Sequence, residues 1–188
     1  MTYTRGKILA DVKVFTPAVM HDDRGSFSVT WNLQELCGDI PELKPFVQCN
    51  RVRSFRGVIR GLHFQLPPQE QGKLVICERG GIFDVVVDIN PTSPTYGQHE
   101  EFYLYSPRQA VWVPPGYAHG YQAVDEAEVT YYVTDYWAPH LDRAILWSDP
   151  TLAIDWPLKS PVVSDKDRQG MTLESWGDVW WNVEGRRK

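Results

Sequence analysis

Apolar and polar residues alternate with a period of two along most of this 188-residue chain. Side chains of a β-strand point in turn to opposite faces of the sheet, so this alternation predicts half-buried strands. The predicted strands are residues 12–15, 26–31, 46–53, 58–65, 73–77, 82–89, 102–105, 110–113, 121–124 and 128–134. Many short strands at intervals of roughly 8–12 residues predict an all-β sandwich or barrel.

Turns and short helices account for the rest of the pattern. Asp22-Asp23-Arg24-Gly25 predicts a tight turn, and residues 33–36 predict one short helix. Gly80-Gly81 lies between two predicted strands and predicts a hairpin that joins them. Residues 165–188 carry tryptophans in a polar setting and predict a helical or irregular C-terminal flap packed on the barrel. No linker is visible, so we expect a single domain spanning residues 1–188.

The composition limits the class of protein. A membrane-spanning helix needs about 20 consecutive apolar residues, and no run of that length occurs. The first residues lack the apolar core of a secretion signal, and three widely spaced cysteines do not suggest a disulfide framework. These features predict a cytoplasmic protein without a membrane partner. A net charge of -5 argues against nucleic acid as a partner, because such binding depends on neutralising many phosphates.

One histidine lies within the predicted strand 58–65. The alternation places His63 and Gln65 on one face together with Gly61, which predicts open space above the imidazole. A lone histidine on a strand is often only a hydrogen-bonded core residue. The pattern alone therefore does not decide whether His63 is a core residue or a functional one. An upstream run of arginines suits either a small anion or a solvated face. The run consists of Arg51, Arg53, Arg56 and Arg60.

Other polar and aromatic residues also need an explanation in an all-β protein. Asp84 lies in the apolar strand 82–89, where a carboxylate is costly unless it meets a cation or lies at an edge. Residues 114–120 predict a tight turn that carries a second histidine, His119. The stretch 131–137 is dense in tyrosine and tryptophan, which suit either core packing or a stacking platform with a phenolic acid.

A series of short motifs runs through the chain in order. The motifs are Asp23-Arg24-Gly25, Gln48-x-Asn50, GVIRGLHFQ at 57–65, Lys73-Leu74-Val75, Phe83-Asp84-Val85, SPTYG at 93–97, PGYAHG at 115–120, Asp149-Pro150, Asp155-Trp156-Pro157 and SDKD at 164–167. The series closely resembles the dTDP-4-dehydrorhamnose 3,5-epimerase family, from about residue 8 to residue 168. The resemblance implies a cupin-type double-stranded β-helix (a jelly-roll barrel), usually a homodimer that exchanges N-terminal strands.

The resemblance also implies an isomerase of deoxysugar biosynthesis that needs no metal and no organic cofactor. Family substrates are nucleoside-diphosphate 4-keto-6-deoxyhexoses, in which the C4 ketone acidifies the protons on C3 and C5. The expected reaction converts dTDP-4-dehydro-6-deoxy-D-glucose to dTDP-4-dehydro-L-rhamnose through an enolate.

Four residues match the family's catalytic positions. By resemblance His63 is the base that removes a proton, and Asp167 orients its ring, with Asp84 as the second candidate for that role. Tyr131 matches the phenol that returns a proton from the opposite face, and Lys73 is suited to the enolate oxygen. An imidazole suits the base because its ordinary pKa is close to neutral pH.

Binding roles follow from the same resemblance. Arg60 and Arg24 are suited to the diphosphate, because a guanidinium matches two phosphate oxygens, and Lys166 is expected to assist them. Phe27 and Trp137 fall where the family sandwiches the nucleobase, and Phe27 is expected to reach in from the partner subunit. The residues that match the sugar and phosphate site are Gln48, Asn50 and His119.

Three positions depart from the family pattern. Val29 stands where the family usually has a glutamate that can hydrogen-bond the base, and Trp137 stands where it usually has tyrosine. Val52 replaces the serine of an Asn-x-Ser motif. Thymine is therefore the expected nucleobase by default. Another nucleotide such as cytidine, or epimerisation at C3 or C5 alone, remains an alternative.

Three rival classes share this type of barrel. Metal-dependent cupin oxygenases typically use a His-x-His pair, a glutamate and a distant histidine, but Gln65 stands where the second histidine of the pair would be. A cofactor-free 3,4-ketoisomerase uses related proton shuttling but fits the motif series less well. A non-catalytic sugar-nucleotide-binding cupin would not need the four candidate catalytic residues together.

Overall fold

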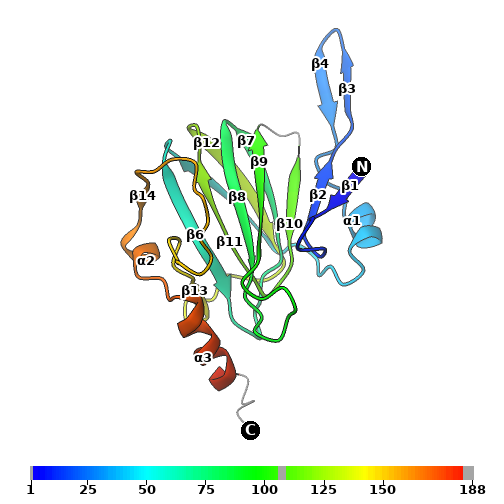
Figure 1. Ribbon diagram of the computed structural model, residues 1–188. Helices are drawn as coiled ribbons and strands as arrows, with labels where there is room; N and C mark the ends of the chain where they lie inside the picture. The colour runs from blue at the N-terminus through cyan, green and yellow to red at the C-terminus, as the bar shows by residue number, and fades with distance from the viewer. Residues whose placement is uncertain (1, 106–108, 184–188) are drawn as a thin grey trace.

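Two β-sheets packed face to face form the body of the molecule (Figure 1). The computed structural model describes residues 2–105 and 109–183. The first sheet has the order β1 (Thr2–Arg5), β2 (Lys13–Thr16), β10 (Ala110–Val113), β7 (Lys73–Arg79), β12 (Ala127–Val133) and β5 (Gln48–Ser54). The second has the order β13 (Asp142–Ala144), β6 (Val58–Gln65), β11 (Tyr117–Ala123), β8 (Gly81–Asp88) and β9 (His99–Tyr105). Neighbours within each order are antiparallel, whereas β14 (Val162–Val163) pairs with β6 in parallel.

The chain crosses between the sheets at most of its strand connections. β5, β7, β10 and β12 belong to the first sheet, whereas β6, β8, β11 and β13 belong to the second. This crossing pattern is that of a double-sheet jelly roll. The expected all-β, cupin-type barrel is therefore confirmed, and each of the predicted strands overlaps an observed one. The alternation of apolar and polar residues does not predict four of the strands. These are β1, β3 (Val19–Asp22), β13 and β14.

The hairpin predicted at Gly80-Gly81 is wrong. β7 and β8 flank these glycines but belong to different sheets, so the segment carries the chain from one sheet to the other. Gly80 has a φ of 76°, and a Cβ built there would lie 2.1 Å from the carbonyl oxygen of Glu126. The glycine is therefore needed for close passage over the turn between β11 and β12, and the dipeptide pattern alone does not distinguish this from a hairpin.

Three apolar clusters hold the layers together. Val75, Val111 and Val129 of the first sheet pack against Ile82 and Val86 of the second, in one part of the space between the sheets. The outer face of the first sheet is covered by a cluster around Phe15, Leu36 and Trp112. A third cluster on the outer face of the second sheet includes Leu62, Phe64, Val85, Trp156 and Trp176. Because both faces of β8 are covered, all of its residues are buried.

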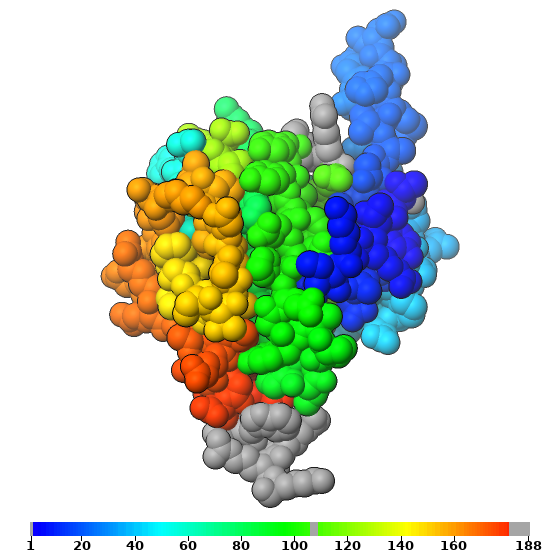
Figure 2. Space-filling view, viewed as in Figure 1, coloured from blue at the N-terminus to red at the C-terminus, as the bar shows by residue number. Residues whose placement is uncertain are grey.

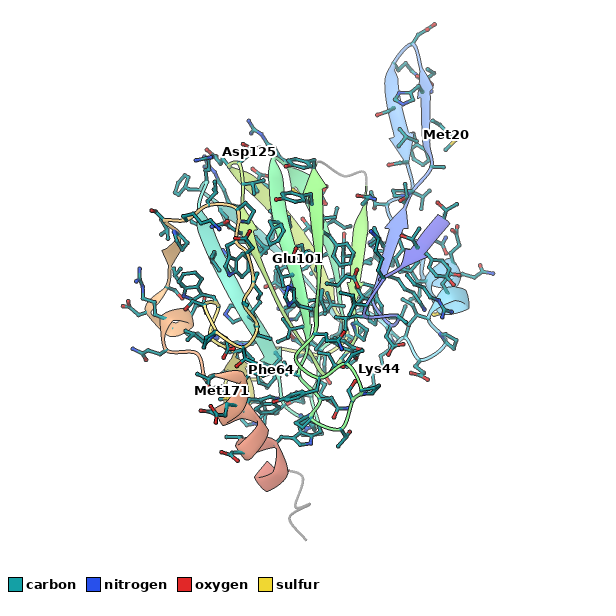
Figure 3. All side chains as sticks on the ribbon, viewed as in Figure 1. Met20, Lys44, Phe64, Glu101, Asp125 and Met171 are labelled. Atoms are coloured by element: carbon teal, nitrogen blue, oxygen red, sulfur yellow. The ribbon has the colours of Figure 1, made fainter. Side chains whose placement is uncertain are left out.

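Helices and loops supply the outer cover. α1 (Leu33–Asp39) is longer than the predicted helix and begins after Asn32, whose side chain accepts hydrogen bonds from the first turn. α2 (Asp165–Arg168) and α3 (Leu173–Val183) form the C-terminal flap. Trp176 of α3 packs edge-on against Phe64 of β6, with ring centroids 4.7 Å apart. The C-terminal segments cover one side of the body in Figure 2, and Figure 3 labels Phe64 near α3. The predicted flap is confirmed as far as residue 183, and residues 184–188 lie outside the described part.

A two-stranded hairpin projects from the body. β3 and β4 (Gly25–Ser28) pair around the predicted turn at residues 22–25. Figures 1 and 2 show this hairpin standing clear of both sheets, and Met20, labelled in Figure 3, lies on it. Its apolar side chains are open to solvent: Met20 is 56% exposed and Phe27 is 63% exposed.

None of the helices in the described residues has both the length and the apolar character of a membrane-spanning segment.

Candidate active site

A cavity of about 200 Å³ lies between the two sheets. Its walls come from β5, β7 and β12 on one side and from β6 and β11 on the other. Six of the residues singled out in the sequence line it: Arg60, His63, Lys73, His119, Tyr131 and Trp137. Residues far apart in the chain therefore meet at one place, which makes this cavity the candidate active site.

Strand β6 reaches the cavity through an irregularity at Gly61. Between β6 and β11, His119 pairs with His63 but Tyr121 pairs with Arg60, so one extra residue lies on β6. Arg60 and His63 consequently both line the cavity, which strict alternation would forbid. Gly61 has a φ of 135°, and a Cβ there would lie 2.5 Å from Cα of Gly120. The prediction that Gly61 leaves open space above His63 is wrong, because Gly61 packs tightly against β11.

His63 is bonded to a buried carboxylate. Its Nε2 lies 2.5 Å from Oδ1 of Asp167, a residue of α2 that is only 3% exposed. The backbone N–H of Gly61 donates to the other carboxylate oxygen, and the backbone N–H of Asp167 donates to the Ser164 hydroxyl that begins α2. Burial acts to raise the pKa of Asp167, but the His63 contact, the Gly61 N–H and the Ser164 side chain outweigh it and hold the pKa below its ordinary value.

A second histidine–carboxylate pair lies beside the first. His119 lies in β11 rather than in the predicted turn, and its Nε2 is 2.7 Å from Oδ2 of the fully buried Asp84. β8 lies between β11 and β9, so Asp84 meets a histidine and does not lie at an edge. Asp84 is therefore not the partner of His63. Its Oδ1 has no hydrogen-bond partner among the residues that the structure describes.

Lys73 of β7 lines the cavity. It is 8% exposed, and its Nζ donates to the carbonyl oxygen of His63 over 3.0 Å. Burial lowers the pKa of Lys73 to about 8, although the nearby carboxylates of Asp142 and Asp84 oppose this shift. A lysine with such a pKa is a charged donor at neutral pH and also able to exchange its proton.

Tyr131 faces the cavity from β12, on the wall opposite His63. Burial raises the pKa of Tyr131, so the phenol keeps its proton at neutral pH. Tyr132 faces the other way and packs against Trp31 and Phe46, with ring centroids 5.1 and 5.8 Å away. These two neighbours therefore lie on opposite faces of the sheet, as alternation along a strand requires.

Asp142 is a cavity residue that the sequence analysis missed. Its Oδ2 accepts hydrogen bonds from Trp137 Nε1 at 3.0 Å and from Lys166 Nζ at 2.5 Å. Burial acts to raise the pKa of Asp142, but these two donors outweigh it and hold the pKa below its ordinary value. The carboxylate thus links Trp137, which is expected to stack on the nucleobase, to Lys166, which is expected to bind the phosphates. Asp142 belongs to the three-residue strand β13, which is too short to show a periodic signal.

Five predicted binding residues do not line this cavity. One of them is Lys166, which instead bonds the cavity residue Asp142. Gln48 and Asn50 lie on β5 and form a hydrogen bond to each other over 2.7 Å. They lie on the same face of β5 as Val52, and Val52 does line the cavity. Arg24 and Phe27 lie on the projecting hairpin, where Arg24 pairs with Asp22 at the surface.

Most of the arginine run is a solvated face. Arg51 pairs with Glu128 and Arg53 with Glu126 on the outer side of β5, so of this run only Arg60 lines the cavity. Within residues 2–105 and 109–183, no group of three or more histidine, cysteine, aspartate or glutamate side chains is placed to hold a metal ion.

Known proteins resemble this chain over most of its length. The family model described as dTDP-4-dehydrorhamnose 3,5-epimerase matches residues 7–175. The dTDP-4-dehydrorhamnose 3,5-epimerase of Pseudomonas aeruginosa is 48% identical over 169 residues, covering 86% of this chain and 91% of the relative. The rmlC epimerase of Mycobacterium tuberculosis superposes with a TM-score of 0.90 at 34% identity, covering 99% of this chain and 97% of that one. A Legionella pneumophila dTDP-6-deoxy-D-glucose-3,5-epimerase, solved with dTDP-4-keto-L-rhamnose, gives a TM-score of 0.87 at 36% identity over 92% and 93% of the two chains.

Proposed function

The chain belongs to the dTDP-4-dehydrorhamnose 3,5-epimerase family and is an isomerase, and from this premise we propose that it inverts both C3 and C5 of a dTDP-linked 4-keto-6-deoxyhexose. The observation that carries the proposal is the single cavity shared by the His63–Asp167 pair, Lys73 and Tyr131. These groups are a base, an oxyanion donor and an acid, which are the three functions that epimerisation beside a ketone requires.

His63 removes the proton through Nδ1. An ionised carboxylate only accepts hydrogen bonds, so the hydrogen between His63 and Asp167 belongs to Nε2. The lone pair is then on Nδ1, and the side chain is 32% exposed toward the cavity. Asp167 fixes this tautomer and stabilises the imidazolium that forms when a C3 or C5 proton is taken.

Lys73 stabilises the enolate. Removal of either proton moves charge onto the oxygen at C4, and a buried ammonium is a strong donor for it because water is excluded. One preorganised donor of this kind contributes about 3–4 kcal/mol to lowering a barrier. The carboxylates of Asp84 and Asp142 keep Lys73 more protonated than burial alone would.

Tyr131 returns the proton from the other side. His63 comes from the second sheet and Tyr131 from the first, so the two side chains approach a bound sugar from opposite walls. Donation of the phenolic hydrogen to the enolate carbon inverts that centre and leaves a phenolate opposite an imidazolium. Exchange with solvent resets both groups before the second centre reacts.

The nucleotide part of the site is proposed to be completed by a second subunit. Trp137, which is 60% exposed, and Arg60, the proposed diphosphate ligand, both line the cavity. The exposed Phe27 and Arg24 on the projecting hairpin support a homodimer in which each hairpin covers the partner's cavity. Gln48, Asn50, His119 and Lys166 remain proposed ligands of the sugar and phosphates.

The shared strands of the three apolar clusters support a single domain over residues 1–188. Cys37 and Cys49 are exposed and no disulfide joins the three cysteines, which supports a reducing compartment such as the cytoplasm.

Proton exchange in deuterated water tests the proposed function. We expect deuterium to be incorporated at both C3 and C5 of dTDP-4-keto-6-deoxyglucose, and NMR measures this incorporation. The cytidine-linked sugar, run in parallel, is expected to react more slowly. Exchange at one centre would make the protein a mono-epimerase, and no exchange with either nucleotide would refute the proposal.

A further inference from the structure

A second phenol, Tyr121 of β11, lines the same cavity, and the mechanism above leaves it without a role. The cavity has a buried floor and an exposed rim. Tyr121 is 5% exposed and Val129 is fully buried, whereas Trp137 at the rim is 60% exposed. A nucleoside diphosphate needs the open rim, so the sugar occupies the floor, and Tyr121 belongs to the part of the cavity that faces the sugar.

One hydrogen bond holds the Tyr121 hydroxyl, and a second holds its partner Ser54. Its hydroxyl lies 3.0 Å from Oγ of Ser54, which is 1% exposed and also accepts a hydrogen bond from Arg60 Nε over 3.0 Å. The buried hydroxyl of Ser54 thus joins the floor of the cavity to the guanidinium at its rim.

The number of hydroxyl hydrogens determines which group donates in each of these hydrogen bonds. Ser54 has one hydroxyl hydrogen, and among the residues that the structure describes its only bonded neighbour able to accept it is Tyr121. With Arg60 donating to Ser54 and Ser54 donating to Tyr121, the Ser54 hydroxyl both accepts and donates a hydrogen bond. The hydrogen of the Tyr121 hydroxyl then remains for a molecule in the cavity. Burial raises the pKa of Tyr121, so that hydrogen is retained at neutral pH.

We propose that Tyr121 donates a hydrogen bond to a sugar oxygen of the nucleotide substrate and so acts as a specificity-determining residue. The inference rests on the proposed function only in taking the ligand to be a nucleotide sugar. A donor fixed from behind by Ser54 discriminates against sugars that lack the matching oxygen, because the phenol would then be buried without a partner. Tyr121 transfers no proton in this role.

Substitution by phenylalanine isolates the hydroxyl. Tyr121→Phe should weaken binding of dTDP-glucose, which lacks the ketone and cannot react, about ten-fold, as expected for one lost hydrogen bond in a buried site. Binding of dTDP alone, which lacks the hexose, should change less than about two-fold. Calorimetry with both ligands gives the two dissociation constants, and with the 4-keto substrate KM should rise while kcat is nearly unchanged.

Two matched variants separate direct contact from indirect effects. Tyr132→Phe also removes a phenolic hydroxyl, but on the outer face of β12, and should leave the binding of both ligands unchanged. Ser54→Ala frees Arg60 as well as Tyr121, so it should weaken dTDP and dTDP-glucose together. Equal weakening of both ligands by Tyr121→Phe, or no weakening of either, would overturn the inference. If the wild type failed to exchange C3 and C5 protons while Tyr121→Phe still selectively weakened dTDP-glucose, the proposed function alone would fall.

Discussion

His63 shows how little one residue reveals before its partners are known. On an alternating strand it is compatible with a core histidine, and its approach to Asp167 depends on a residue 104 positions later in the chain. The family motifs named both members of this pair, whereas periodicity placed only His63 on a strand. Asp142 and Tyr121 show the limit of both approaches. Their roles depend on contacts across strands, with Trp137 and Lys166 in one case and with Ser54 in the other.

The buried ammonium of Lys73 predicts the pH dependence of the reaction. Its pKa of about 8 lies below the ordinary value of lysine, so the protonated form that stabilises the enolate is present below that pH and lost above it. We expect kcat/KM to fall as pH rises through about 8.

Lys73→Gln provides the matched comparison. Loss of the charged donor should lower kcat by about 10²–10³, and the remaining activity should lack the decline near pH 8. Steady-state pH profiles of both proteins measure this. An unchanged alkaline decline in the variant would assign it to another group.

At the scale of the element, the strands could be predicted but their neighbours could not. Alternation located β6 and β10 with their observed bounds, because strand pattern is a local property. The pairing of β7 with β10 and β12, rather than with β8, is not local. Nor is the irregularity at Gly61, which appears only once β11 lies against β6.

Gly61→Ala tests the importance of this irregularity. The φ of 135° is unfavourable for alanine, and the new Cβ would meet the backbone of Gly120 at 2.5 Å. We expect a loss of roughly 2–4 kcal/mol in the free energy of unfolding, together with loss of activity because Arg60 and His63 would no longer share the cavity.

Gly38→Ala is the control for this substitution. Gly38 lies in α1, and nothing lies within 4 Å of a Cβ built there. Its stability should be unchanged or higher by up to about 1 kcal/mol. Chemical denaturation of the three proteins gives the comparison, and a fully stable, active Gly61→Ala would contradict the account.

At the scale of the whole molecule, the projecting hairpin is the least self-contained part. Its exposed Met20 and Phe27 bury little against the body of their own subunit. The sequence motifs placed Arg24 in a binding site, yet within one subunit it lies outside the cavity. The contradiction disappears if the hairpin serves the partner's cavity.

Mixed dimers test this exchange directly. Subunits carrying Arg24→Ala or His63→Ala are each expected to be inactive as homodimers. When equal amounts are unfolded together and refolded, about half of the dimers are mixed and each mixed dimer has one intact site. About a quarter of wild-type activity should therefore be recovered. Analytical ultracentrifugation should show the dimer. No recovery would mean that the hairpin acts on its own subunit or not at all.

Epimerisation by this site requires two proton-transfer groups on opposite walls of one cavity, and Tyr131→Phe separates their actions. Without the phenol, His63 can still remove a proton and return a solvent-derived deuteron to the same face. NMR of dTDP-4-keto-6-deoxyglucose in deuterated water should therefore show deuterium incorporation without inversion in Tyr131→Phe, and neither in His63→Ala. Inversion at the wild-type rate in Tyr131→Phe, or unchanged exchange in His63→Ala, would contradict the account.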